Sequence, residues 1–364
     1  MKARPFWLPE LGHRERDLIA SVLDENYLND GKVTTQFEQR VAELLEVSHG
    51  IAVTSGTAAL SLALYALGVR PGDEVIVPDV TFVATASAVT MIGATPVLVD
   101  VDETTLMLDP DEVSKAVTPR TRAIIPVHVS GRPAPMDELK KIAQEHCIAL
   151  VEDAAEALMS RYKGQFLGTI GQAGCFSLSP NKTITTGQGG LIVTNDSMLA
   201  ARLRALKDQG RDVQGTGGAD QHNHIGFNFK LTNLQAAVGL GQLDLLPARV
   251  ARLRAIRREY VEGLSGVEGV RLLPVDEQDG TVPQWIDICV DSRRDELIAF
   301  LKSHSMICRE FWHPLHHHQP YRQSDTEFPV STRLVPQACW LPSAFQLESD
   351  DIQEICRRVR EFFS

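Results

Sequence analysis

One lysine stands alone in a long uncharged stretch of the chain. Lys182 is the only charged residue between positions 164 and 195. An ammonium group is costly to bury among uncharged neighbours, and lysines in such surroundings are the ones that form imines with carbonyl compounds. The pattern therefore makes Lys182 a candidate Schiff-base lysine. The alternative is a solvent-exposed side chain on a turn after Pro180.

Two carboxylates follow an apolar run that ends at residue 151. A carboxylate at the carboxyl end of a parallel strand lies where open α/β sheets bind ligands. Asp153 is therefore a candidate for holding a cofactor's ring nitrogen in its protonated form. The alternative is an N-cap on the next helix.

Small polar residues at 54–59, TSGTAA, lie between a predicted strand and a predicted helix. Free amides and hydroxyls at the start of a helix form a phosphate site, although such residues also serve as simple N-caps. Phe82, in DVTFVATA, follows another predicted strand. Its ring could lie flat on an aromatic ligand or belong to the core.

Histidines gather in HPLHHHQPY, which contains His313 and residues 316–318. Metal ligation would be one use of such a cluster. Pro314 interrupts any helix there, however, and no cysteine or carboxylate pattern accompanies the histidines. The sequence therefore predicts no metal site.

These residues are set on alternating strands and helices. Apolar, largely β-branched runs predict strands at 51–53, 74–77, 96–100, 123–127, 149–152, 174–178 and 191–194, and the clearest helices between them are 57–67, 84–92, 137–146 and 197–210. Buried strands separated by helices form a mainly parallel sheet covered on both faces. No long helical pattern occurs between 166 and 191, so the last strands are expected to pair antiparallel. The fold class is α/β, with a mixed, mostly parallel seven-stranded sheet.

The second part of the chain has a different pattern. Helical spacing predicts helices at 231–243 and 245–264, with Pro247 near the start of the second. Strands at 270–273 and 286–290 and helices at 294–303 and 350–363 predict a small α+β unit. We therefore expect a large domain over 1–250 and a small one over 251–364.

The composition of the chain disfavours several classes of partner and function. The 364 residues carry a formal charge of −11, which disfavours nucleic acids and anionic membranes as partners. The six cysteines are scattered, the start lacks an apolar signal segment, and the uncharged stretches at 51–69 and 80–99 are too rich in glycine, serine and threonine for a membrane span. A cytoplasmic protein is expected. A nicotinamide oxidoreductase is disfavoured because no GxGxxG motif occurs.

Seven segments in order resemble the DegT/DnrJ/EryC1/StrS family of sugar aminotransferases, pyridoxal-phosphate enzymes of the aspartate aminotransferase fold. They are TSGTAAL (54–60), DVTFVATASA (79–88), GATPVLVDVD (93–102), PVHVSGRPAPMDEL (126–139), EDAAEA (152–157), FSLSPNKTITTGQGG (176–190) and HIGFNFKLTNLQAAVGLGQL (224–243). Together they span nearly the whole chain. The last two are similar to the perosamine-synthase branch of the family.

The resemblance implies a role for each matching residue. Lys182 would carry pyridoxal 5'-phosphate, with pyridoxamine 5'-phosphate as its aminated form, and Asp153 would pair with the ring nitrogen. The remaining cofactor contacts would be Ser177 and the amides of Gly56 and Thr57 at the phosphate, Phe82 stacked on the ring, Glu156 beside the phenolic oxygen and, from the neighbouring subunit, Asn228 at the phosphate. Such sharing implies a homodimer. The loop with His313, His316 and Tyr321 would line the sugar pocket.

The implied reaction moves an amino group from L-glutamate to a nucleotide-linked 4-keto-6-deoxyhexose. A 3-keto sugar, or one carried by dTDP or UDP, remains an alternative, because Glu156 stands where many relatives have Gln and Phe229-Lys230 replaces a common Tyr-Arg. A dehydratase of the same family would have a histidine at the lysine position. A regulatory protein would not need Lys182, Asp153 and Ser177 at the family's spacing.

Overall fold

A seven-stranded sheet forms the centre of the chain. The computed structural model describes residues 3–212, 221–276, 278 and 280–364, and in these ranges the strand order is β1-β9-β8-β5-β4-β2-β3. The strands are β1 (His49–Val53), β2 (Glu74–Pro78), β3 (Thr95–Val99), β4 (Thr121–Ile124), β5 (Ala149–Asp153), β8 (Ala173–Ser177) and β9 (Gly190–Thr194). β9 pairs antiparallel with β1 and β8, and the other neighbouring strands are parallel. The predicted α/β class and the mixed edge are confirmed.

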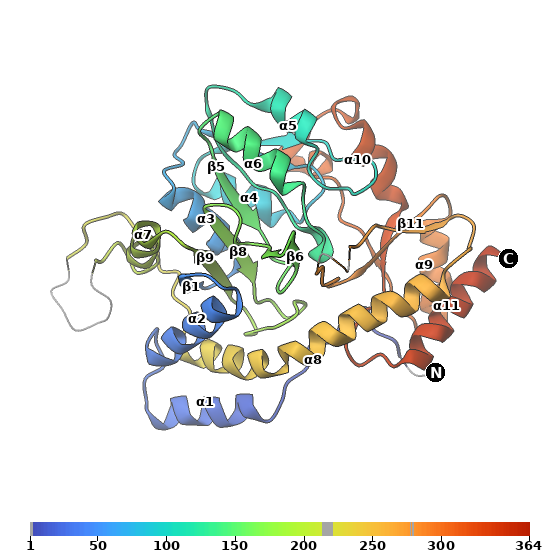
Figure 1. Ribbon diagram of the computed structural model, residues 1–364, viewed down its shortest axis with the longest axis horizontal. Helices are drawn as coiled ribbons and strands as arrows, with labels where there is room; N and C mark the ends of the chain where they lie inside the picture. The colour runs from blue at the N-terminus through green and yellow to red at the C-terminus, as the bar shows by residue number, and fades with distance from the viewer. Residues whose placement is uncertain (1–2, 213–220, 277, 279) are drawn as a thin grey trace.

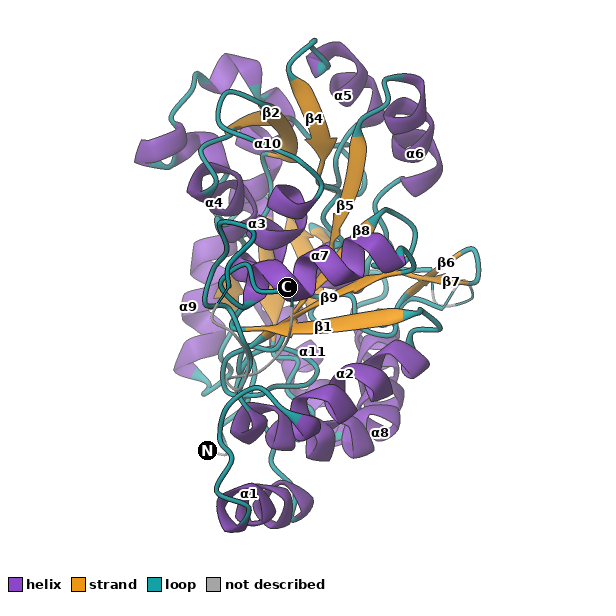
Figure 2. Cartoon of the chain, turned by 90° about the vertical axis from the view of Figure 1, so that its left-hand side faces the viewer, coloured by secondary structure: helices purple, strands orange, loops and turns teal. Residues whose placement is uncertain are grey.

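Helices cover both faces of this sheet (Figures 1 and 2). α3 (Gly56–Ala66), α4 (Ala84–Met91) and α7 (Ser197–Lys207) share one core cluster with the sheet, and the opposite face packs on α2 (Lys32–Leu44), α5 (Pro110–Ala116) and α6 (Met136–Glu145). Successive strand residues point to opposite faces, so Ile51 and Val53 join the first cluster and Ala52 the second. This two-sided burial explains why the strands are continuously apolar.

A second, four-stranded antiparallel sheet lies toward the carboxyl end, in the order β10-β11-β13-β12. Its strands are β10 (Val270–Leu272), β11 (Ile286–Val290), β12 (Arg309–Glu310) and β13 (Ala338–Leu341), and the nearby helices are α9 (Arg294–Ser303), α10 (Pro329–Leu334) and α11 (Ser349–Phe363). A two-stranded hairpin joins β6 (Arg161–Tyr162) and β7 (Gln165–Phe166), and short 3-10 helices occur at η1 (Val129–Gly131), η2 (Leu315–His317), η3 (Gln319–Tyr321), η4 (Asp325–Glu327) and η5 (Val335–Gln337).

One long helix, α8 (Asn233–Gly263), replaces the two helices expected at 231–243 and 245–264. It packs on α1 (Arg14–Asp24) and α2 near the large sheet and on α11 near the small one (Figure 1). Pro247 lies inside it and removes one backbone hydrogen bond. Arg249 bridges this gap by donating to Gln242 Oε1 over 2.7 Å. The prediction of two helices was wrong because tertiary contacts on both sides of Pro247 hold a continuous helix. The expected domain boundary at residue 250 falls within α8, and the division stays a prediction.

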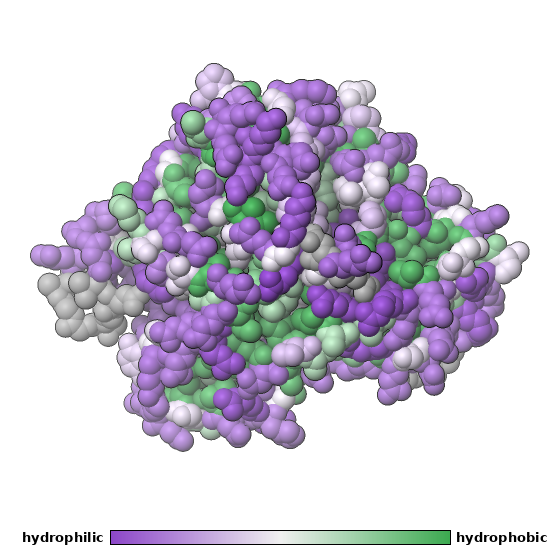
Figure 3. All heavy atoms as spheres, in the orientation of Figure 1, coloured by the Kyte–Doolittle hydropathy of each residue, from purple (hydrophilic) through white to green (hydrophobic). Residues whose placement is uncertain are grey.

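The surface is largely polar. In Figure 3, hydrophilic residues cover most of this face and hydrophobic ones show in patches between them. Among the described residues, no helix combines the length and the apolar character needed to cross a bilayer.

Candidate active site

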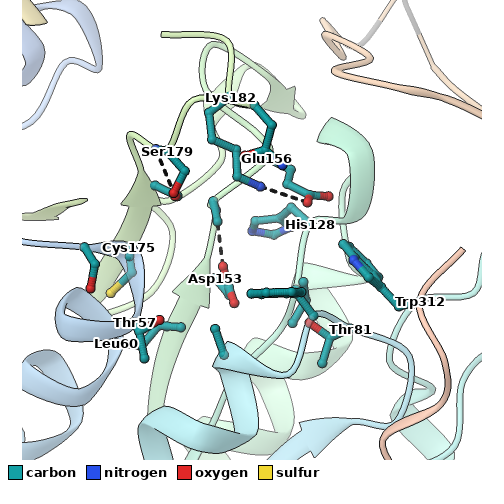
Figure 4. A pocket seen from close by; sticks show the side chains of 18 of the residues that line it. Thr57, Leu60, Thr81, His128, Asp153, Glu156, Cys175, Ser179, Lys182 and Trp312 are labelled. Carbon is teal, nitrogen blue, oxygen red and sulfur yellow. Dashed lines mark hydrogen bonds and ion pairs between the residues drawn. The ribbon is translucent and has the colours of Figure 1, made fainter. Parts of the chain in front are cut away.

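A cavity of about 370 Å³ lies at the carboxyl ends of the parallel strands. This edge is where open α/β sheets bind ligands, because the connections that leave it can surround a small molecule. The large sheet supplies segments after β1, β2, β4 and β8 and the end of β5, and the second half of the chain supplies Trp285, Arg309 and Trp312. Figure 4 shows several of these side chains around one space.

Lys182 reaches this cavity from the connection between β8 and β9. Its Nζ atom donates to Oε1 of Glu156 over 3.0 Å, and its side chain is 12% exposed. The same amine lies 4.9 Å from the centre of the Trp285 ring. The alternative of a lysine pointing freely into solvent is therefore wrong. The amine is held inside the cavity by a carboxylate from another segment.

Asp153 is the last residue of β5 and lines the same cavity. Its Oδ2 accepts from the Thr85 hydroxyl over 2.8 Å, and its Oδ1 accepts from the Ala155 amide over 3.2 Å. No helix follows it directly, so the N-cap alternative does not apply. Burial raises the pKa of the Asp153 carboxyl, while Thr85, Ala155 and the charge of Lys182 oppose the rise. A cation beside this carboxylate would offset the cost of its burial.

Glu156 links the lysine to the β4 connection. Its Oε2 accepts from the Ser130 amide over 2.9 Å, while its Oε1 accepts from Lys182. Burial raises the pKa of the Glu156 carboxyl, and Lys182 is the main opposing influence. Lys182 and Glu156 thus form a buried ion pair in the wall of the cavity that Asp153 also lines (Figure 4).

The first turn of α3 forms a cradle of backbone amides. Ser55 is the N-cap, and its hydroxyl accepts from the Ala58 amide over 3.1 Å, which leaves the amides of Gly56 and Thr57 at the helix end. A Cβ atom on Gly56 would lie 3.1 Å from Cβ of Ser177. Ser177 Oγ in turn lies 3.0 Å from Ser179 Oγ. Amides, the helix dipole and hydroxyls converge here as a phosphate site requires.

These groups fit pyridoxal phosphate. Asp153 is a buried acceptor that needs a cation beside it, the α3 cradle suits a phosphate dianion, and Lys182 offers a primary amine in the same cavity. Phe82 lines this cavity with 52% of its surface exposed, so its ring is available for stacking. The individual roles of these residues stay predictions.

The four remaining site predictions fall outside the lining of this cavity. Asn228 accepts from Lys230 Nζ over 3.0 Å and forms a bridge with Asp208, away from the lining of its own chain's cavity. Tyr321 instead donates to Ser87 on α4 over 3.4 Å. His316 is fully buried against Asp79. The structure therefore places Tyr321 and His316 outside the lining of this cavity, and their contacts with a sugar stay predictions.

His313 lies in a neighbouring cavity of about 420 Å³ that shares Thr81, Phe82, Arg309 and Trp312 with the first one. The structure thus places His313 next to the candidate site, and its contact with a sugar stays a prediction.

Several lining residues were missed by the sequence analysis. His128 is fully buried in the cavity wall, with Nδ1 accepting from the Ala134 amide over 3.1 Å and Nε2 donating to Glu152 over 3.0 Å. Trp285 and Trp312 come from the second half of the chain. Their approach depends on long-range folding, so spacing in the sequence gives no signal for them. His128 lies within the PVHVSG segment, which follows a predicted strand, so its position at the strand end could have been predicted from the sequence.

The mixed sheet, the cavity at its carboxyl edge and the buried lysine together define a pyridoxal-phosphate-dependent enzyme. The model of the DegT/DnrJ/EryC1/StrS aminotransferase family matches residues 9–360. The chain belongs to this family.

Relatives and solved structures agree with this assignment. The chain is 38% identical over 325 residues to a GDP-perosamine synthase of Caulobacter vibrioides, covering 88% of this chain and 87% of the relative. The structure of DesI determined in the presence of its TDP-sugar product superposes with a TM-score of 0.91 at 34% identity, covering 99% of this chain and 93% of DesI. Spr1654 of Streptococcus pneumoniae in its PLP form superposes with a TM-score of 0.94 at 26% identity over 100% of both chains.

These findings confirm the predicted family, fold, cofactor and enzyme class. The chain is a pyridoxal-phosphate-dependent aminotransferase of the nucleotide-sugar type, and the regulatory alternative is set aside.

Proposed function

We propose that the protein transfers the amino group of L-glutamate to a GDP-linked 4-keto-6-deoxyhexose. The observation that carries the aminotransfer is the placement of Lys182 and Asp153 in one cavity, with the phosphate cradle of α3 in its wall. The identity to the Caulobacter GDP-perosamine synthase supports the nucleotide and the sugar.

Each residue has a definite task in this reaction. Pyridoxal phosphate, when bound, supplies the electron sink for the amino-acid carbanion. Lys182 Nζ takes the proton from the Cα atom of the donor, and general acid-base transfer of this kind contributes roughly 10²–10⁴-fold to a rate. Asp153 holds a proton on the ring nitrogen through its carboxylate, which Thr85 and Ala155 orient. Glu156 positions Lys182 Nζ within the cavity.

The substrate is tested with a panel of keto-sugars. GDP-, TDP- and UDP-linked 4-keto-6-deoxyhexoses and their 3-keto isomers are each incubated with the enzyme and L-glutamate, and the products are measured by mass spectrometry. We expect the GDP-linked 4-keto sugar to give the highest kcat/KM. A preference for a TDP-linked sugar would favour the second candidate, for which the likeness to DesI is the observation.

The cytoplasm is the compartment we infer. All six cysteines are free thiols in the structure, and four of them are buried. Unpaired thiols of this kind persist in a reducing compartment.

We further propose that the active unit is a homodimer with shared sites. Large apolar side chains are strongly exposed around α7 and the segment before Asn228: Met198 is 84% exposed and Ile225 is 83% exposed. Apolar side chains with this exposure are available to pack in the core of an interface with a second chain. Asn228, three residues after Ile225, would then reach the cofactor phosphate of the neighbouring subunit rather than that of its own chain.

Mixing two impaired variants tests this sharing. The variants Asn228→Ala and Lys182→Ala are mixed at limiting cofactor after subunit exchange. Asn228→Ala loses a hydrogen bond to a charged group, which costs on the order of 1.5–3 kcal/mol of cofactor affinity, and Lys182→Ala loses the reactive amine, so each homodimer is impaired. If sites are shared, each heterodimer contains one intact site and one site with both defects. After statistical exchange about half of the dimers are heterodimers, so about a quarter of all sites are intact. Activity should therefore rise above that of either parent.

The matched control mixes Lys182→Ala with Asp153→Asn. Both residues line one chain's cavity, so every heterodimer site has a defect and no recovery is expected. If Asn228→Ala and Lys182→Ala exchange subunits and the activity of the mixture does not rise, each chain builds its own site.

A further inference from the structure

We propose that His316, His317 and Asp325 bind a divalent transition-metal ion, zinc above all, outside the active-site cavity. One ligand atom from each residue lies within 4.8 Å of the others. The two histidines stand on η2 and the aspartate on η4, eight and nine residues apart. The carboxylate absent from the HPLHHHQPY segment itself is thus supplied by the chain beyond it.

The spacing of the ligand atoms suits tetrahedral coordination. Asp325 Oδ1 lies 3.1 Å from His317 Nε2 and 3.4 Å from His316 Nε2. Bonds of about 2.0–2.2 Å to nitrogen and oxygen place tetrahedral ligands roughly 3.4 Å apart. A zinc ion therefore requires only small side-chain shifts. Two imidazoles and a carboxylate are zinc ligands, whereas magnesium and calcium prefer oxygen alone.

His316 is already fixed in the orientation of a metal ligand. Its Nδ1 donates to Oδ2 of the fully buried Asp79 over 2.7 Å, and its amide donates to the other oxygen of this carboxylate over 2.8 Å. A carboxylate on one ring nitrogen of a histidine fixes the tautomer and directs the other nitrogen to a metal. Ser331 also donates to Asp79 Oδ2, over 2.6 Å, and the His316 ring stacks on Phe328.

This arrangement leaves two electron-rich atoms facing each other. With Nδ1 directed at Asp79, the other ring nitrogen of His316, Nε2, faces Asp325 Oδ1 at 3.4 Å. The Thr332 hydroxyl, 3.3 Å from Nε2, can donate a hydrogen bond but brings no charge. A cation between Nε2 and the carboxylate would replace these weak contacts with bonds to both atoms. The side chains of His317 and Asp325 are 36% and 63% exposed, so the ion can enter from solvent.

The metal would join the two ends of the loop 315–328. Through His316 it would also be tied to Asp79, which follows β2 and precedes Thr81 and Phe82 in the cavity wall. The site is therefore a clamp on this wall and takes no part in the aminotransfer. Its existence does not depend on the substrate proposed above.

The test is equilibrium dialysis of the untagged holoenzyme against micromolar zinc, followed by metal analysis. We expect one zinc per chain. His317→Gln and Asp325→Asn change exposed side chains, so both variants should fold, and each should bind zinc at least tenfold more weakly. Zinc should also raise the melting temperature of the unmodified protein and not that of the variants, because a ligand stabilises the state that binds it.

His318→Gln and Glu327→Gln are the matched controls, since they remove one histidine and one carboxylate of the same loop that lie outside the proposed triad. Both should keep the zinc. Binding that is absent, or equally strong in Asp325→Asn and the unmodified protein, would overturn the proposal. Absence would mean that Asp325 contacts the two histidines directly, without an ion between them, and equal binding would place zinc at another site.

Discussion

Replacing Lys182 with alanine should give a folded, colourless protein that has lost almost all of its aminotransfer activity. The amine lies in the cavity 3.0 Å from Glu156 and 4.9 Å from the Trp285 ring centre. Among the described residues that line this cavity, it is the only lysine. Because the variant loses both the covalent hold on the cofactor and the proton transfer, turnover should fall by about four orders of magnitude or more.

The attachment site can be measured without turnover. Borohydride reduction of the yellow protein followed by peptide mapping should place the cofactor on Lys182. Lys163→Ala is the control, because Lys163 pairs with Asp137 on the surface and should keep colour and activity. A label on any of the nine other lysines in the sequence would refute the assignment.

Changing Asp153 to asparagine should leave the fold intact and reduce kcat by about two orders of magnitude or more, or a few kcal/mol of transition-state stabilisation. The buried carboxylate is matched to a protonated ring nitrogen, because burial raises the pKa of Asp153 unless a cation stands beside it. An amide carries no charge and cannot keep that nitrogen protonated.

The expected split between the kinetic constants makes this test specific. Asp153→Asn should affect kcat far more than the melting temperature, and Thr85→Val, which removes only the 2.8 Å hydrogen bond to Oδ2, should cause a smaller loss of kcat. Asp137→Asn, at an exposed pair, is the surface control. Near-normal turnover of Asp153→Asn would exclude the proposed role.

The large sheet was predictable because its signals are local. Each of its seven strands contains an apolar run, α6 has one apolar face, and α3 and α4 are short apolar segments between strands. α1 and α2 went unassigned. α1 has only one buried apolar residue, Val22, so its apolar face is weak. Pro247 misled the prediction for α8, since a proline's local preference for a helix start was outweighed by packing along the whole helix.

The candidate site likewise contains residues with a local sequence signal and residues without one. Lys182, Asp153 and the α3 cradle lie on the edge of one sheet, where strand ends and short loops fix their positions. Trp285, Arg309 and Trp312 reach the cavity only through the docking of the second half of the chain. The burial of His316 could not be predicted from its residue type. Its ring was expected to contact the sugar, but it is held in the core by a hydrogen bond to Asp79, which is 237 positions away.

Because α8 is continuous, the two sheets are connected by one bendable helix and not by two helices with a flexible joint. A helix of 31 residues is about 46 Å long, and Pro247 lies close to its midpoint. Bending is easiest where a backbone hydrogen bond is missing. A flexure of about 5° there would carry the far end of the helix roughly 2 Å, enough to widen or narrow the space between the large sheet and Trp285. The hydrogen bond from Arg249 to Gln242 spans this point and restrains bending there.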